Sequence, residues 1–380
     1  MTHQALFLLI MAHFIVVPGI TQTKHNTHHQ YRLIIGTYTN SGKSDGIYTY
    51  RFNGNNGEAV FLSKTTTTDP SFLVMGKQNR FLYAVNELGG GKGSVSAFRY
   101  QHSNGEISLL NTVASGGDHP CYITTDRKNR YLFVANYTGG NFSAIRIRED
   151  GSTDSAIQTI QHFGKSITSR QEKAHVHSTV LSPDEKYLLV QDLGTDQITV
   201  YAVNLNAVAN PVTEIPVSVY NTEPGSGPRH LEFHPNKKWA YTVQELDGTV
   251  TFFAFENGKL KKMQNISLHA SGSTGKDGAA DIHISPDGKF LYASNRGSFN
   301  EITIYRIDAK GKLIFLATTP TLGIAPRNFG IDPSGNFLLS GNHLSDQIVV
   351  FKRNPTNGLL TDTGTRIQTG APVCIRFIPE

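Results

Sequence analysis

Two charged side chains flank a short hairpin-like segment in the second half of the chain. Residues 227–246 read GPRHLEFHPNKKWAYTVQEL, with Arg229 before one apolar run and Glu245 just after the next. The HPNKK between them is typical of a turn, because proline presets φ and asparagine accepts turn geometry. Arginine can hold an anion or an oxyanion, and its charge keeps a neighbouring carboxylate ionised. The alternative without a functional role is a structural salt bridge between two strands.

The elements that would position this pair recur along the chain. The segments 70–87, 120–137, 176–193, 228–245, 280–296 and 326–343 each contain a short apolar strand, a polar turn and a second strand richer in aromatic residues. A third strand with alternating apolar and polar residues follows each of them, and then a more variable fourth. Four strands per unit, at a period near 50 residues, indicate a β-propeller.

The two ends of the chain complement each other in this repeat. After six full units, APVCIRFIPE (371–380) supplies a single strand, whereas RLIIGTYT (32–39) and GIYTYRF (46–52) match a second and a third strand. We therefore predict an all-β fold: one domain over 31–380, a seven-bladed propeller with four-stranded antiparallel blades, whose last blade is closed by both termini. Such closure removes an open sheet edge. A pair of β-sandwiches does not account for the regular period.

The repeat also predicts where the charged pair lies. The start of the first strand and the end of the second meet at one end of an antiparallel hairpin, and Arg229 and Glu245 occupy these two positions. The same or adjacent positions in other units hold further polar residues: Asn136, His175, His177, Arg296, Arg327 and His343. We expect these side chains to line one polar pocket near the central channel. Three arginines and a glutamate suit an anionic or oxygen-rich small molecule.

Several of these residues also have simpler interpretations. Asn136 recurs in the repeat as Asn86, Asn295 and Asn342, which favours side-chain bonds to the backbone. His175 and His177 would point to one face of a strand, as metal ligands can, but spacing suggests no third ligand, so we expect no metal and no cofactor.

The cysteines, the charge and the N-terminus narrow the class of protein. Cys121 and Cys374 fall in non-adjacent units, so we expect no disulfide. A net charge of +5 without a basic stripe argues against nucleic-acid binding.

The apolar run 5–17 is too short for a membrane span but is typical of a secretory signal, so we predict a signal peptide over 1–22 and a periplasmic or secreted protein. The oligomeric state stays open between monomer and dimer.

The repeated motifs resemble the seven-bladed propeller lactonase family, which includes 6-phosphogluconolactonases and carboxymuconate lactonising enzymes. The resemblance is carried by LYAVNE, LFVANY and LYASNR, and by HVHSTVLSPDEKYLLVQDL, GSGPRHLEFHPNKKWAYTVQEL and GIAPRNFGIDPSGNFLLSGNH. It implies a metal-independent site in which Arg229, Glu245 and a histidine act together. That histidine is His177 in preference to His175. A further arginine is implied, Arg327 in preference to Arg296.

The expected reaction is the hydrolysis of a sugar-acid lactone, with the arginines holding the anionic substrate. Either Glu245 or His177 would act as general acid or base. Two alternatives remain: a non-catalytic propeller that acts as a binding module in the cell envelope, and a metal-dependent gluconolactonase.

Overall fold

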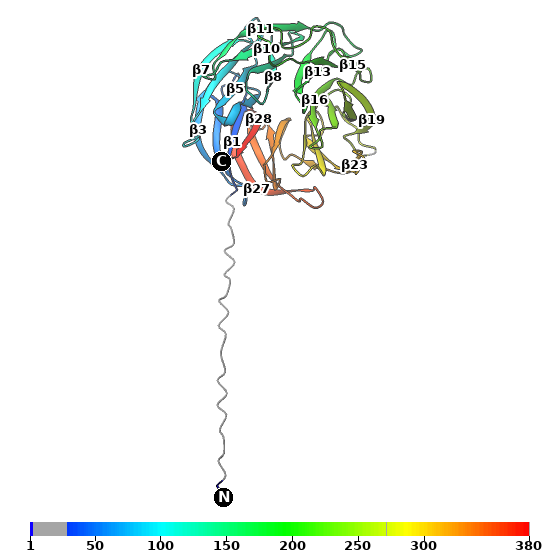
Figure 1. Ribbon diagram of the computed structural model, residues 1–380. Coiled ribbons are helices and arrows are strands. Elements are labelled where there is room, and N and C mark those ends of the chain that lie inside the picture. Colours follow the sequence, from blue (N-terminus) through cyan, green and yellow to red (C-terminus); the bar gives the residue numbers. More distant parts are fainter. Residues whose placement is uncertain (3–28, 271, 380) are drawn as a thin grey trace.

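The structure, a computed structural model, describes residues 1–2, 29–270 and 272–379. The predicted signal peptide therefore lies outside the described residues from residue 3 onwards. The described residues form seven four-stranded sheets, arranged as blades around a central opening (Figure 1). They contain one short 3₁₀ helix, η1 (Lys77–Asn79), and no helix long and apolar enough to cross a membrane.

The closing blade joins both ends of the chain, as predicted. Its strand order is β28-β1-β2-β3, and β28 pairs antiparallel with β1, with Phe377 opposite Leu33 and Cys374 opposite Gly36. The strands of this blade are β1 (Gln30–Thr37), β2 (Gly46–Asn53), β3 (Ala59–Thr66) and β28 (Pro372–Pro379). The C-terminal strand thus covers an edge that the N-terminal strands alone would leave open.

The other six blades are each continuous in sequence. Their first strands are β4 (Leu73–Met75), β8 (Pro120–Thr125), β12 (Val176–Leu181), β16 (Pro228–Phe233), β20 (Ala279–Ile284) and β24 (Pro326–Ile331). Their second strands are β5 (Phe81–Asn86), β9 (Tyr131–Asn136), β13 (Tyr187–Asp192), β17 (Trp239–Gln244), β21 (Phe290–Asn295) and β25 (Phe337–Asn342). Their third strands are β6 (Ser94–Tyr100), β10 (Asn141–Ile147), β14 (Gln197–Ala202), β18 (Thr249–Glu256), β22 (Glu301–Ile307) and β26 (Gln347–Arg353). Their fourth strands are β7 (Ile107–Ala114), β11 (Thr153–Gln161), β15 (Ser218–Asn221), β19 (Lys259–Ser267), β23 (Leu313–Pro320) and β27 (Leu360–Gln368).

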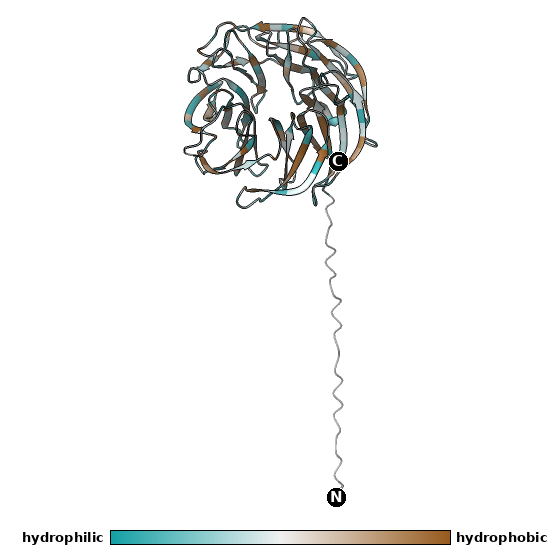
Figure 2. Ribbon diagram, turned by 180° about the vertical axis from the view of Figure 1, so that it is seen from behind, coloured by the Kyte–Doolittle hydropathy of each residue, from teal (hydrophilic) through white to brown (hydrophobic). Residues whose placement is uncertain are grey.

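The hydrophobic core lies between the blades. One cluster, for example, packs Tyr292 and Ile304 of the β20–β23 blade against Phe329, Leu338 and Phe351 of the β24–β27 blade. In Figure 2 the hydrophobic positions lie mainly along the strands. Burial on both faces explains why the second strands read as almost continuous apolar runs. This packing fixes the first strand of every blade next to the central channel.

The two cysteines are free, as predicted. Cys121 and Cys374 are both buried, and they lie in different blades. Cys374 Sγ accepts a hydrogen bond from the backbone nitrogen of Leu73, 3.3 Å away. Each thiol therefore serves as a small packing group in the wall of the channel.

Candidate active site

The residue at the start of each first strand is displaced from the strand ladder. Pro228 pairs with Gln244 and His230 with Val243, so Arg229 is an extra, unpaired residue between them. The same register shift leaves out Cys121, His177 and Arg327 in three other blades. A β-bulge re-aims the side chain of the extra residue, and bulges are common beside active sites. Because the shift recurs at the start of the first strand in several blades, the extra residues together form a ring of side chains at one end of the channel.

Arg229 and Glu245 form a buried ion pair. Arg229 Nε donates to Glu245 Oε2 at 2.8 Å, and the two side chains are only 1% and 6% exposed. The same guanidinium donates to the backbone carbonyl of Ala280 and to Nε2 of His230, the latter at 3.2 Å. Such a pair is held in one geometry, because breaking it would leave an uncompensated charge in the interior.

Two more arginines converge on Glu245. Arg296 Nη2 lies 3.1 Å from Glu245 Oε2, and Arg170 Nη2 donates to Glu245 Oε1 at 2.9 Å. Arg170, which the sequence reasoning missed, comes from the long connection between β11 and β12 and also donates to the hydroxyl of Tyr137. No repeat position marks Arg170, because this connection (162–175) is longer than the equivalent connections in the other units. Glu245 is thus the common anchor of three guanidinium groups.

The charges at this site set its protonation. Burial opposes the ionisation of Glu245, but the charges of Arg296, Arg229 and Arg170 outweigh it and lower the pKa of Glu245 to about 2. Burial, together with Arg296 and Arg327, lowers the pKa of Arg229 to about 10, so it stays protonated at neutral pH. Glu245 is therefore an ionised but weak base, since proton affinity falls with pKa.

His177 lies beside this group as a neutral ring. It is 4% exposed, and its Nδ1 is 3.8 Å from Cys121 Sγ. Its ring meets those of Tyr137 and His230 edge-on, at centroid distances of 5.4 and 5.3 Å. Burial and the charge of Arg229 lower the pKa of His177 well below the usual value. The ring of His177 is therefore uncharged at neutral pH, with one nitrogen that donates and one that accepts.

His175 lies against the face of the Tyr137 ring and is held by other groups. It stacks on Tyr137 at a centroid distance of 4.5 Å. Its Nδ1 is 3.1 Å from the carbonyl oxygen of Tyr137, and its Nε2 is 3.1 Å from Glu172 Oε1. Both ring nitrogens of His175 have hydrogen-bond partners. A structural role in the wall of the site therefore suits His175 better than it suits His177.

Arg327 lies in a second group of side chains at the same end of the channel, which we call the rim of the propeller. It lies over the ring of Tyr38 at 5.4 Å and 3.6 Å from Glu87 Oε2, to which the Tyr38 hydroxyl donates at 2.8 Å. His343 contacts the same tyrosine ring edge-on, and burial together with Arg327 lowers the pKa of His343 to about 4. Tyr38 was missed because it lies in the closing blade, whereas Glu87 shares its repeat position with Glu245.

Arg229 and Arg327 meet at the channel itself. Together with Ser71, Cys121 and Val373 they line a small cavity there. Within the described residues Arg327 makes no hydrogen bond, and Nη2 of Arg229 makes none either. The guanidinium of Arg327 and Nη2 of Arg229 are therefore donors that a ligand in this cavity could use.

Asn136 lies apart from this ring. Its side chain is fully buried and donates to Asn141 Oδ1 at 2.7 Å, within its own blade. It serves the structural role that its recurrence in the repeat suggested. Over the described part of the chain, no group of three or more His, Cys, Asp or Glu side chains is arranged to hold a metal ion.

A chain of polar groups runs from buried Arg229 to the half-buried side chains of His283 and Glu232, which line a second cavity together with His230 and Asp281. Since a guanidinium only donates, His230 Nε2 must accept from Arg229, and Nδ1 then donates to Asp281 Oδ1 at 2.8 Å. Asp281 Oδ2 lies 3.0 Å from His283 Nε2, and His283 Nδ1 lies 2.7 Å from Glu232 Oε2. Asp281 therefore fixes the tautomer of His230, and through it the orientation of Arg229.

This chain predicts a pH effect on stability. Burial disfavours the charged ring of His283, but Asp281 and Glu232 outweigh it and raise the pKa of His283 to about 10. A raised pKa gives stability that is full below about pH 6.5 and is lost as the pH rises towards 10. Between pH 6.5 and 9.5 we expect the wild type to lose at least about 1 kcal/mol more unfolding free energy than His283→Gln, as measured by urea unfolding. Equal losses in the two proteins would contradict the assignment.

Known proteins share this architecture. The family model described as "Lactonase, 7-bladed beta-propeller" matches residues 32–377. The chain belongs to the seven-bladed β-propeller lactonase family. It is 38% identical over 333 residues to a 6-phosphogluconolactonase of Formosa agariphila, covering 86% of this chain and 94% of the relative. It is 31% identical to a 6-phosphogluconolactonase of Bacillus subtilis, covering 91% and 98%.

A solved structure supports the same conclusion. The periplasmic gluconolactonase of Pseudomonas aeruginosa superposes with a TM-score of 0.87 at 37% identity, covering 92% of this chain and 99% of that one. The resemblance inferred from the repeated motifs is therefore confirmed, and the chain is a lactonase. Membership of a lactonase family favours an enzyme over the alternative of a non-catalytic binding module.

Proposed function

We propose that this lactonase hydrolyses an anionic sugar-acid lactone at the rim that holds His177, Arg229 and Glu245. The observation that carries the proposal is the surplus of positive charge. Four arginines, Arg170, Arg229, Arg296 and Arg327, face two carboxylates, Glu87 and Glu245. Guanidinium groups recognise carboxylate and phosphate oxygens in paired geometry. Relatives named 6-phosphogluconolactonase support a phosphorylated gluconolactone.

In the proposed reaction, His177 takes a proton from the attacking water. The water oxygen bonds to the lactone carbonyl carbon, and the negative charge that forms on the carbonyl oxygen is stabilised by Arg229 and Arg327. The ring C–O bond then breaks, and protonated His177 returns its proton to the leaving ring oxygen, so that a sugar acid forms. An anion beside these arginines offsets their charge on His177 and raises its proton affinity at that moment.

Glu245 has a different task in this proposal. Its low pKa makes it a poor base, but its two oxygens hold Arg170, Arg229 and Arg296 in place. Preorganised charges stabilise a transition state without having to rearrange during the reaction. Arg296 and Arg170 then help to bind the anionic part of the substrate, and His343 and His175 complete the wall of the site.

A pH-stat assay of lactone opening tests the proposal. With 6-phosphogluconolactone we expect turnover above the spontaneous rate, and a KM at least about tenfold lower than with unphosphorylated gluconolactone, because one charged contact contributes about 1.5–3 kcal/mol. We expect the rate to be unchanged by a chelator. Loss in the chelator with recovery on adding a divalent cation would favour the metal-dependent alternative, and no turnover of either lactone would contradict the proposal.

We further propose that the protein is exported, with residues 31–380 as its mature propeller domain. The apolar run 5–17 and the similarity to a periplasmic gluconolactonase support this. Mass spectrometry of the protein isolated from separate cell fractions tests this. A protein found outside the cytoplasm that lacks its first residues would support export, and a full-length protein in the cytoplasm would contradict it. Export would also make an unphosphorylated sugar lactone accessible, which is why the assay above includes both substrates.

A further inference from the structure

A basic cavity of about 540 Å³ lies far from the candidate active site. It is lined by four segments from three blades: 78–81 at the start of β5, 128–131 at the start of β9, 146–149 at the end of β10, and 205–208 between β14 and β15. Tyr131 begins β9, whereas Tyr137 of the active site follows the end of that strand. Because a strand of six residues spans about 20 Å, the cavity opens on the opposite face of the propeller.

The cavity gathers positive charge that the protein does not neutralise. Five cationic side chains line it: Arg80, Lys128, Arg130, Arg146 and Arg148. Arg130 is paired with Asp126 at 3.0 Å and Arg148 with Asp154 at 2.6 Å. Within the described residues, Arg80, Lys128 and Arg146 have no ion-pair partner. Glu149 is the single acidic side chain among the residues that line the cavity.

The repeat shows that Lys128 is a local departure from the blade pattern, whereas Arg80, Arg130 and Arg146 stand at positions that hold lysine or arginine in several blades. The turns between first and second strands read SPDEK, HPNKK, SPDGK and DPSGN in four blades, but GKQNR and DRKNR in the two blades whose turns line this cavity. Lys128 thus stands where Asp184 and Asp287 stand in other blades, and these aspartates bond to their own turns. Turn formation does not require a cation there, so the turn alone does not explain Lys128.

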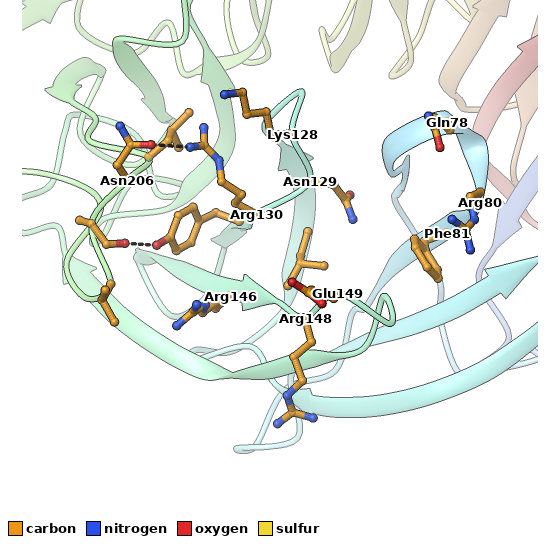
Figure 3. Close-up of a pocket in the computed structure, with 15 residues that line it drawn as sticks. Gln78, Arg80, Phe81, Lys128, Asn129, Arg130, Arg146, Arg148, Glu149 and Asn206 are labelled. Atoms are coloured by element: carbon orange, nitrogen blue, oxygen red, sulfur yellow. Dashed lines mark hydrogen bonds between the residues drawn. The ribbon is translucent and has the colours of Figure 1, made fainter.

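The cavity also offers hydrogen bonds and an apolar wall. Figure 3 shows Arg130 and Asn206 joined on one side, with Arg146 below them, whereas the end of Arg148 points away. Asn206 Oδ1 accepts from Arg130 at 2.8 Å, which leaves the amide nitrogen of Asn206 as a further donor. Phe81, Leu205 and Val208 add apolar surface. A volume of this size suits a small molecule, since ligand pockets measure about 300–1,000 Å³.

We propose that this cavity is a second binding site, for a small organic anion that carries two or more phosphate or carboxylate groups. Lys128 and Arg146 are its principal charged contacts, Arg80 flanks it, and Arg130 and Asn206 supply directed donors. Arg80, Lys128 and Arg146 are exposed at this cavity, and a polyvalent anion bound among them would offset their like charges. The site is independent of the lactonase reaction.

Isothermal titration calorimetry with citrate and with fructose 1,6-bisphosphate tests the proposal, each in about 20 mM and 150 mM salt. We expect binding of at least one anion, weaker at the higher salt. In the double variant Lys128→Ala/Arg146→Ala we expect affinity to fall at least tenfold while lactone turnover stays unchanged. Arg306→Ala is the matched control, because Arg306 is the exposed repeat equivalent of Arg146 in the β20–β23 blade. It should bind as the wild type does.

The two anions also separate the possible sources of the ligand. Preference for the bisphosphate indicates a phosphorylated metabolite, and preference for citrate indicates a polycarboxylate. An anion bound only at the active-site arginines would bind the double variant as well as the wild type. That result, or an absence of binding to the wild type, would overturn the proposal.

Discussion

Replacing His177 with glutamine should lower kcat for lactone hydrolysis by at least about 100-fold, because general acid–base catalysis contributes about 10²–10⁴-fold. Glutamine preserves most of the volume and a polar end but cannot exchange a proton near neutral pH. KM should change by less than about threefold, since in our proposal the arginines, and not this ring, hold the substrate anion. Initial rates across a range of substrate concentrations in a pH-stat would separate the two constants.

His175→Gln is the matched control for this experiment. The residue is two positions away and contacts the same Tyr137 ring, but both of its ring nitrogens are already occupied. We expect its kcat to stay within about tenfold of the wild type. A His177→Gln enzyme with nearly wild-type kcat would remove His177 from the reaction and return the role of base to Glu245.

Replacing Glu245 with glutamine should have the second large effect, through charge and not through proton transfer. The neutral amide leaves Arg229 buried at 1% exposure without its counter-ion. Breaking a buried pair by removing one partner costs about 3–5 kcal/mol, so we expect a loss of unfolding free energy of about 3 kcal/mol. We expect kcat/KM to fall by at least about 100-fold, because the arginines lose their common anchor. Urea unfolding and steady-state kinetics measure the two effects.

The effect of Glu245 on stability should also depend on pH. Its pKa is depressed to about 2 from an ordinary value of about 4.5. The ion pairs therefore contribute fully above about pH 4.5, and their contribution is lost as the pH falls from 4.5 towards 2. Glu245→Gln should lack this part of the acid sensitivity, so the stability gap between wild type and variant should narrow on acidification.

Glu87→Gln supplies the comparison on the same rim. Glu87 is the repeat equivalent of Glu245, but its ion-pair partner Arg327 is 3.6 Å away and its side chain is 14% exposed. Because this contact is longer than that of Glu245 with Arg229, we expect Glu87→Gln to lose less unfolding free energy than Glu245→Gln. If Glu245→Gln keeps wild-type stability and loses all activity while His177→Gln remains active, Glu245 is the catalytic base and not the anchor.

The propeller itself was predictable from the sequence because its period is local. Each blade repeats a strand, a turn and a second strand within about 20 residues, and turn residues such as those of SPDEK and HPNKK mark the reversals. The closing blade followed from complementarity, since APVCIRFIPE supplies the one strand that the N-terminal segments lack. The same alignment placed Arg229 and Glu245 at one end of a hairpin.

The alignment of the repeats could not predict which residues from other blades and connections contact the site. Arg170 reaches Glu245 from a connection outside the repeat, and Tyr38 reaches Arg327 from the closing blade. Equally, Asn136 occupies a rim position by alignment, but its amide is buried in bonds within its own blade. Contacts between distant segments depend on the packing of blades against one another, and no short-range pattern records that packing.

The fold, the closure of the ring and the end of the blades at which His177, Arg229 and Glu245 gather follow from the sequence alone, because they depend on strand period and hairpin geometry. The orientation and the protonation of these side chains depend instead on the packing of the folded ring. The bulge after each strand start takes Arg229, His177 and Arg327 out of the ladder. Burial and the convergence of three arginines then fix the protonation of Glu245. Both depend on groups far apart in the chain, which meet only when the ring closes.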